Sequence, residues 1–172
     1  MSLSLYHASI PQLEKMLKNL SRWLDKSVDY AKSKNFDPAV FLNARLAPNQ
    51  FPLTKQIQSA CDNAKFIAAR LAGKDPPSHP DTETTLDELK ARIAKVTDYV
   101  STFKPSDFEG AETRKIALAW MPGKVLSGAD YLFEFGLPNF YFHTTSAYAI
   151  LRHNGVELGK ADFIGSVNWK DG

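Results

Sequence analysis

Hydrophobic positions recur every three or four residues through most of the chain, a spacing that is typical of amphipathic helices. In the first such stretch, residues 13–31, the apolar face comprises Leu13, Met16, Leu17, Leu20, Trp23, Leu24, Val28 and Ala31. Pro11 allows two interpretations, because the helix either begins near it or bends there after an earlier start at Ser4. The pattern predicts a long first helix in either case.

Two more helices follow with the same periodicity. The second is predicted over residues 53–72, after a short connecting helix over 39–46. Thr85 and Glu88 match a capping box, which predicts the start of the third helix, and Pro105 ends that helix. The proline-rich segment 75–84 between the two helices is predicted to be an exposed connection.

The hydrophobic period then changes from about 3.6 to 2. Apolar residues alternate over 116–120 and again over 131–135, and a turn signal occupies 121–124. This pattern predicts a β-hairpin between the third and fourth helices, with a loop around Ser127–Gly128. A lone hairpin is marginally stable in water, so we expect it to pack against the helices.

A fourth helix completes the predicted set. Pro138 opens it and Gly155 closes it, and the tail over 156–172 is predicted to fold back on the helices with Trp169 anchoring the end. These elements predict a mainly α fold, namely a four-helix bundle with a small β-hairpin between helices three and four. The length of 172 residues suits one domain over the whole chain, 1–172.

Composition and charge exclude several classes of protein. Lys and Arg number 21 against 19 Asp and Glu, and these charges are interleaved, so we expect no nucleic-acid partner. No run approaches the roughly 20 apolar residues of a membrane helix, and no signal peptide is evident, which predicts a cytoplasmic protein without a membrane partner. The single cysteine, Cys61, lies on an apolar helix face and forms no internal disulfide.

The fourth helix holds the most informative candidate chemistry. His143 and His153 lie about 15 Å apart along a helix axis, so they do not bind the same metal ion. Asn139 lies one turn before His143, and Asn154 lies three turns after it at nearly the same angle. No carboxylate stands at helical spacing to activate His143 as a base. The sequence thus predicts a ligand-binding role for His143, Asn139 and Asn154, with a buried structural histidine as the alternative.

The most specific stretches of the chain are residues 138–143 (PNFYFH) and 147–155 (AYAILRHNG), with support from 51–57 and 159–165. Together they resemble a bacterial family of unknown function in the DinB-like and YfiT-like superfamily of metalloenzymes. It implies a four-helix bundle in which three histidines surround a divalent metal, usually nickel, zinc or iron. One of these histidines comes from early helix two, and the other two form an HxxxH pair on helix four.

The resemblance also suggests which residues occupy the metal positions. With Leu151, Arg152 and Gly155 placed on the family's Leu-Arg-x-x-Gly segment, His143 falls at the second histidine of the pair and Asn139 at the first. Gln56 falls near the helix-two position. Amide oxygens are poorer ligands than imidazole for nickel or zinc. The resemblance therefore implies a degenerate site between helices two and four, in which His143, Asn139 and Gln56 either hold a metal weakly or form a polar core.

Two functions follow from this reasoning, and the sequence leaves both open. The first is a DinB-like enzyme or enzyme relative that holds a small molecule between its helices. Some superfamily members are thiol-dependent transferases, so the implied chemistry is transfer or isomerisation. The second is a non-catalytic interaction protein, a homodimer, with a polar core in place of the metal site.

Overall fold

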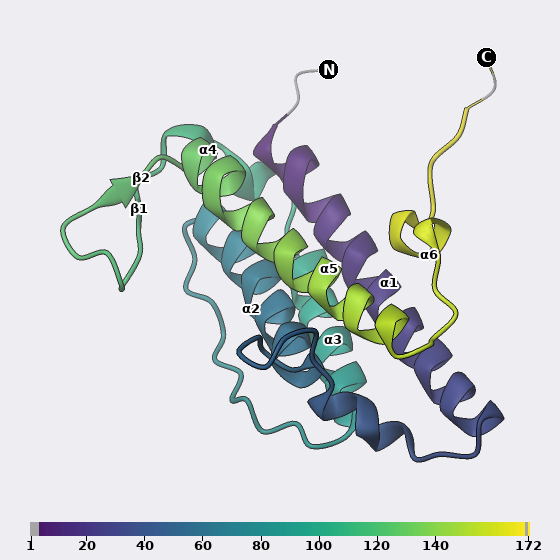
Figure 1. The fold of residues 1–172 in the computed structure, drawn as a ribbon. Coiled ribbons are helices and arrows are strands. Elements are labelled where there is room, and N and C mark those ends of the chain that lie inside the picture. Colours follow the sequence, from purple (N-terminus) through teal and green to yellow (C-terminus); the bar gives the residue numbers. More distant parts are fainter. Residues whose placement is uncertain (1–3, 171) are drawn as a thin grey trace.

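Four long helices run side by side and enclose the core of the protein (Figure 1). The computed structural model describes residues 4–170 and 172. The long helices are α1 (Leu5–Ser33), α2 (Leu53–Leu71), α3 (Leu86–Ser101) and α5 (Leu137–His153). This arrangement confirms the predicted mainly α fold and the four-helix bundle.

The first helix begins at the earlier of its two predicted starts. Ser4 caps α1, because its hydroxyl oxygen accepts a hydrogen bond from the backbone N–H of His7 at 3.5 Å. Pro11 then lies inside the helix. The chain accommodates this proline without ending the helix, and the later start at Pro11 is excluded.

The apolar faces of the long helices meet in one contiguous core. α2 packs most extensively against α5, and α1 against α3. Four alanines of α2 are fully buried, and their small side chains let the neighbouring helices approach closely: Ala60, Ala64, Ala68 and Ala69. The opposite faces are polar, and in the described part of the chain no helix has both the length and the apolar character needed to cross a bilayer.

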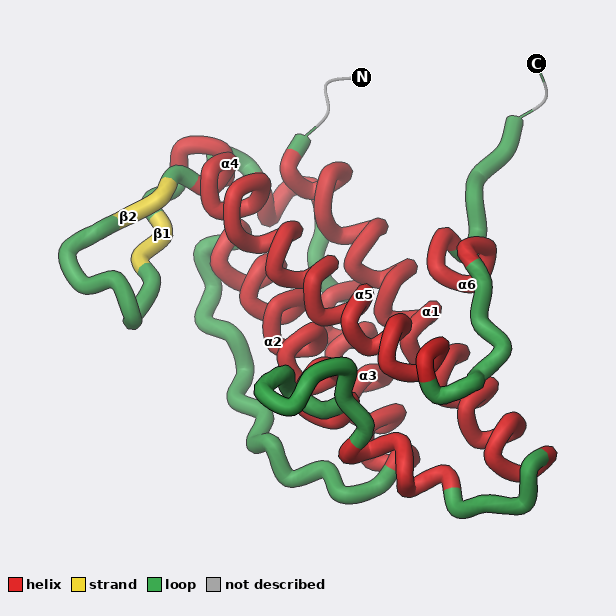
Figure 2. The backbone as a smooth tube through the Cα atoms, in the orientation of Figure 1, coloured by secondary structure: helices red, strands yellow, loops and turns green. Residues whose placement is uncertain are grey.

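Short helical turns and irregular segments connect the bundle helices (Figure 2). A 3₁₀ helix spans Pro38–Asn43, where a connecting helix over 39–46 is predicted, and the Asp37 side chain accepts a hydrogen bond from Ala39 N at 2.9 Å. Further 3₁₀ turns span Pro105–Phe108 and Ala111–Thr113. Residues 75–84 form the long, irregular connection that the prolines predict.

A small hairpin lies between α3 and α5, as predicted, but its second strand is not where the sequence places it. Strand β1 (Ile116–Ala117) pairs antiparallel with β2 (Val125–Leu126), in the register Ile116 to Leu126 and Ala117 to Val125. The connecting loop therefore runs over 118–124, and the predicted loop at Ser127–Gly128 is wrong. The predicted strand over 131–135 is also wrong, because these residues are helical.

Local capping and burial explain why residues 131–135 form a helix. The Ser127 hydroxyl accepts a hydrogen bond from Asp130 N at 3.1 Å and starts α4 (Gly128–Asp130), which continues through a π-helical segment (Tyr131–Gly136) into α5. A strand would place residues 131 and 133 on one face. Tyr131 is instead fully buried, whereas Phe133 is 52% exposed, because the helical turn directs the two side chains apart.

The C-terminal segment returns to α1, as predicted, but Trp169 does not anchor it. Helix α6 (Lys160–Ile164) lies against Trp23, whose indole N–H donates to Asp162 O at 3.1 Å. Phe163 stacks on the Trp23 ring with 5.6 Å between centroids. Trp169 is 85% exposed, so the prediction of an anchoring role is wrong, and Phe163 makes the contact with the bundle.

Candidate functional site

Three of the four polar residues expected at the site, His143, Asn139 and Gln56, converge between α2 and α5. His143 contacts Gln56 near the start of α2, and Asn139, one turn earlier on α5, contacts Asn63, two turns later on α2. The two helices are therefore antiparallel. A third polar contact follows, in which Arg70 donates to the hydroxyl of Tyr131 at 3.1 Å. We call these three contacts the polar seam.

The heptad spacing of Gln56, Asn63 and Arg70 explains why α2 places all three on one face. Seven residues are close to two helical turns, so side chains at this spacing lie in line along a helix. Gln56 is fully buried and Asn63 is nearly so. Sequence reasoning found Gln56 but missed Asn63 and Arg70. The available signal was their spacing of seven.

The orientation of the Gln56 amide determines which nitrogen of His143 carries a proton. The Gln56 Nε2 group donates to the carbonyl oxygen of Phe51 at 3.2 Å, so Gln56 Oε1 faces Nδ1 of His143 at 2.7 Å. Since Oε1 only accepts, Nδ1 is the protonated nitrogen in the neutral ring. The lone pair of His143 Nε2 has no hydrogen-bond partner among the residues that the structure describes, 4–170 and 172.

Burial keeps the His143 ring neutral. The side chain is only 8% exposed, and desolvation lowers its pKa below the ordinary value of 6.5, with a smaller contribution from the positive charge of Lys55. The neutral form therefore dominates at neutral pH. No carboxylate in the described chain contacts Nδ1, so the ring is oriented by a neutral amide and is not activated by a charge.

Asn139 provides a second open acceptor beside His143. Its Nδ2 group donates to Asn63 Oδ1 at 2.7 Å, and Asn63 Nδ2 donates to Ser59 O at 2.8 Å. These bonds fix the orientation of both amide groups, and they leave Asn139 Oδ1 as the remaining acceptor of its side chain. Asn139 is half-buried. The seam thus presents Nε2 of His143 and Oδ1 of Asn139 one helical turn apart.

This donor set is a poor match for the three-histidine metal site that the resemblance implies. Gln56 Oε1 already accepts from His143 Nδ1, so Gln56 orients the histidine and does not serve beside it as a ligand. One imidazole nitrogen and one amide oxygen remain. In addition, the described residues contain no group of three or more His, Cys, Asp or Glu that could hold a metal ion. We therefore derive no chemistry through a metal.

Asn154 is not part of this arrangement. It lies eleven residues after His143, about 16 Å along the helix axis. Asn154 caps the C-terminus of α5, where its Nδ2 group donates to Ile150 O at 2.7 Å, and it is exposed. The expected ligand role came from its angle around the helix, which is similar to that of His143, but the distance along the axis separates them.

Cys61 is a structural residue, as its place on the apolar face indicates. It is fully buried, and burial raises the pKa of its thiol to about 12. At neutral pH the nucleophilic thiolate is therefore essentially absent.

A buried ionic network on α2 and α3 was not found by sequence reasoning. Arg92, with a side chain only 2% exposed, contacts Asp62 at 2.9 Å, Asp81 at 3.0 Å and Glu83 at 3.0 Å. Burial opposes ionisation of Glu83, but hydrogen bonds from Gln58 and Arg92 outweigh it and lower the pKa of this carboxyl. The network attaches the 75–84 connection to the bundle. The sequence did contain a signal for this network, namely an arginine placed three residues after Leu89, on the apolar face of α3.

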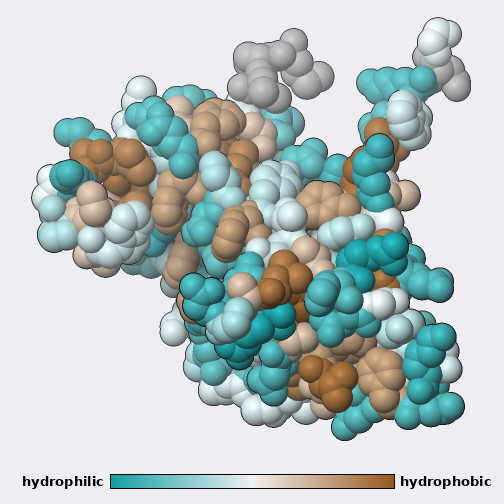
Figure 3. All heavy atoms as spheres, viewed as in Figure 1, coloured by the Kyte–Doolittle hydropathy of each residue, from teal (hydrophilic) through white to brown (hydrophobic). Residues whose placement is uncertain are grey.

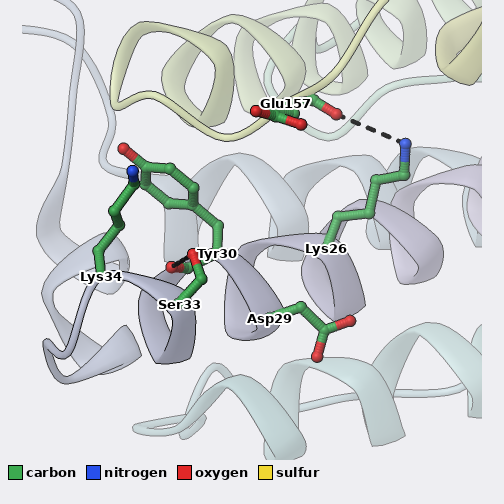
Figure 4. A pocket seen from close by; sticks show the side chains of 6 residues that line it. All are labelled: Lys26, Asp29, Tyr30, Ser33, Lys34 and Glu157. Carbon is green, nitrogen blue, oxygen red and sulfur yellow. Dashed lines mark hydrogen bonds between the residues drawn. The ribbon is translucent and has the colours of Figure 1, made fainter.

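A polar hollow of about 350 Å³ lies away from the seam, at the C-terminal end of α1 (Figure 4). Its lining contains two lysines and two carboxylates: Lys26, Lys34, Asp29 and Glu157. Lys26 Nζ donates to the backbone oxygen of Glu157 at 3.4 Å. The numbers of opposite charges are equal, and the hollow contains none of the expected site residues.

The fold is a DinB-like four-helix bundle with polar contacts between α2 and α5. Residues 5–164 match the family described as a domain of unknown function, DUF1993, and the chain therefore belongs to that family. It is also similar to a solved structure, a DinB family member protein from Shewanella denitrificans. The two are 47% identical with a TM-score of 0.94, over 98% of this chain and 96% of that chain. No curated protein matches the chain.

Proposed function

We propose that this DinB-like protein binds a small molecule at the polar seam between α2 and α5. The observation that carries the proposal is the open Nε2 of His143, whose tautomer is set by the Gln56 amide at 2.7 Å. Asn139 Oδ1 adds a second acceptor. Two acceptors at a neutral site favour a ligand that donates hydrogen bonds, such as an alcohol, an amide or an amine.

Aromatic side chains on the same part of the molecule favour a ligand that also has apolar surface. Phe51, whose carbonyl accepts from Gln56, is 51% exposed, and Phe142, beside His143 in sequence and in ring contact with it, is 56% exposed. Exposed aromatic groups beside a few oriented polar atoms are typical of ligand sites. The proposal includes no catalytic step, because the group that orients His143 is a neutral amide.

NMR titration of the protein with small hydrogen-bond donors tests this proposal. Propanamide, propanol and propylamine serve as probes, and we expect saturable shifts of amide signals in α2 and α5. His143→Ala should remove these shifts, whereas His153→Ala, an exposed site on the same helix, should keep them. Identical shifts in His143→Ala, with its fold verified by circular dichroism, contradict the proposal.

Metal analysis of protein purified without a histidine tag addresses the divalent metal that the resemblance implies. We expect substoichiometric nickel, zinc and iron, because the seam offers a single imidazole nitrogen. Stoichiometric metal that disappears in His143→Ala would replace the small-molecule proposal with a metal centre.

The second candidate function is a non-catalytic homodimer. It rests on the exposure of three large aromatic side chains on or next to α2 and α5, namely Phe51, Phe133 and Phe142, each more than half exposed. Surfaces of this kind often mark interfaces between proteins. Light scattering across a dilution series tests for the dimer. A mass of twice 19.2 kDa for the native protein, together with the monomer mass for Phe142→Asp, favours the dimer. A monomer at all concentrations contradicts it.

A further inference from the structure

We propose a second binding site, independent of the polar seam, in which the hairpin hollow takes a small amphipathic carboxylate. The hairpin hollow is a space of about 200 Å³ beside β1 and β2, lined by Ile116, Leu118, Trp120, Met121, Lys124, Val125, Leu126 and Phe135. Seven of these side chains are apolar, and Lys124 alone is charged. The space equals roughly seven water volumes, which suits a short aliphatic chain or one aromatic ring.

The hollow has a buried floor and an exposed rim. Ile116 and Leu118 are 4% and 5% exposed, whereas Trp120 is 60% and Val125 56% exposed. The hairpin projects from the bundle (Figure 1), and apolar residues gather over it on the molecular surface (Figure 3). When a ligand covers apolar side chains at a concave surface, removing them from contact with water contributes favourably to the free energy of binding.

Aromatic contacts hold the hollow in a defined shape. Trp120 lies 5.4 Å from Phe135 between ring centroids, and Phe135 lies 6.1 Å from the buried ring of Tyr131. These contacts attach the hairpin to the π-helical segment that begins the fourth bundle helix. One wall of the hollow is therefore helical and fixed by the core, so the space does not depend on the two short strands alone.

Charge determines the kind of occupant. Lys124 forms no ion pair in the part of the chain that the structure describes, and no carboxylate lines the hollow. An apolar ligand with one anionic group would pair that group with the Lys124 ammonium while its chain covers the apolar floor. The same positive charge disfavours an amine of the same size.

Fluorescence titration with hexanoate and hexan-1-ol tests the site, with Trp120 as the internal reporter. The background variant Trp169→Phe removes the most exposed tryptophan, while Trp23 is 1% exposed and insensitive to ligand. We expect saturable changes with both probes and about fivefold tighter binding of hexanoate at low salt, as an exposed ion pair provides. The preference should shrink at high salt.

Matched variants separate this site from adventitious binding. Lys124→Gln should remove the preference for hexanoate, and Lys115→Gln, an exposed lysine outside the lining, should keep it. Val125→Asp should abolish binding of hexanoate, whereas Val167→Asp, an exposed valine in the tail, should not. Equal binding of the two probes, or an unchanged preference in Lys124→Gln, overturns the proposal. A Trp120 signal that depends on protein concentration assigns the hollow to a second copy of the chain and also overturns it.

Discussion

Replacing Gln56 with glutamate tests the contact that defines the polar seam. The change keeps the size of the side chain but places a carboxylate 2.7 Å from Nδ1 of His143. An adjacent negative charge favours the protonated imidazolium. The pKa of His143, which burial holds below 6.5 in the native protein, should therefore rise above that value.

The structure limits the size of this increase. Coulomb's law at an effective dielectric constant of about 20 gives an attraction of about 6 kcal/mol at this separation, which is an upper bound. Burial of the new carboxylate opposes its ionisation, and its second oxygen would face the Phe51 carbonyl, now 3.2 Å from Gln56 Nε2. We therefore expect a pKa increase of about 1–2 units in the Gln56→Glu variant.

The substitution also reverses the effect of His143 on stability. In the native protein the folded-state pKa is lower than the unfolded-state value, so stability is lost as the pH falls below about 6.5. In Gln56→Glu the folded-state pKa is the higher one. The added stability is then fully present below pH 6.5 and is lost as the pH rises through the folded-state pKa.

NMR titration of the histidine Cε1–H signals measures the pKa directly, with His143 assigned by comparison with His143→Ala. Urea unfolding at several pH values between 5 and 8 measures the change in stability. Gln12→Glu, on α1, is the control and should leave the His143 titration unchanged. An unchanged pKa in folded Gln56→Glu would show that the hydrogen bond between Nδ1 and Oε1 is absent in solution.

Three further predictions concern the packing of the bundle. Arg92→Met should lower the free energy of unfolding in urea by about 3 kcal/mol, because three carboxylates lose their buried partner; a loss below about 0.5 kcal/mol would contradict this. In thermal unfolding, Gly128→Ala should lower the free energy of unfolding by about 3 kcal/mol, because a Cβ at this position would lie 1.8 Å from Ala111 O. Gly123→Ala should lower it by only about 1 kcal/mol, because the space there is open and only the φ of +77° is unfavourable. Equal losses in the two variants would refute the steric reason. Iodoacetamide at pH 8 should leave Cys61 unmodified in the folded protein and should alkylate it in urea, as measured by mass spectrometry. Rapid alkylation of Cys61 in the folded protein would refute its burial.

The sequence indicated which polar side chains meet between α2 and α5 better than periodicity alone would allow, because the family resemblance added long-range information. Helical spacing placed Asn139 beside His143, and the resemblance placed Gln56 opposite them. It did not show that Gln56 orients the histidine, since that depends on the Phe51 carbonyl turning the amide. Asn154 shows the limit of angle alone, because a matching angle around a helix says nothing about axial distance.

The hairpin shows a second limit. Alternation over 131–135 is a strand signal, yet the Ser127 cap and the burial of Tyr131 make the segment helical. In so short a segment, apolar residues two positions apart fit either a strand or a helix, and only packing against the core distinguishes the two structures. The shorter strand at Val125–Leu126 is too brief to produce a periodic signal.

By itself the sequence determined the four long helices, the capping box of the third and their apolar faces, because these depend on residues within a few turns of one another. The tertiary structure decided which polar groups meet across α2 and α5, how Arg92 is compensated, and how the hairpin encloses its hollow. Each of these contacts joins residues far apart in the chain, and its geometry depends on how the helices pack. The physical reason is that local periodicity specifies which face is buried, whereas the partner of a buried polar atom is chosen only when two faces come together.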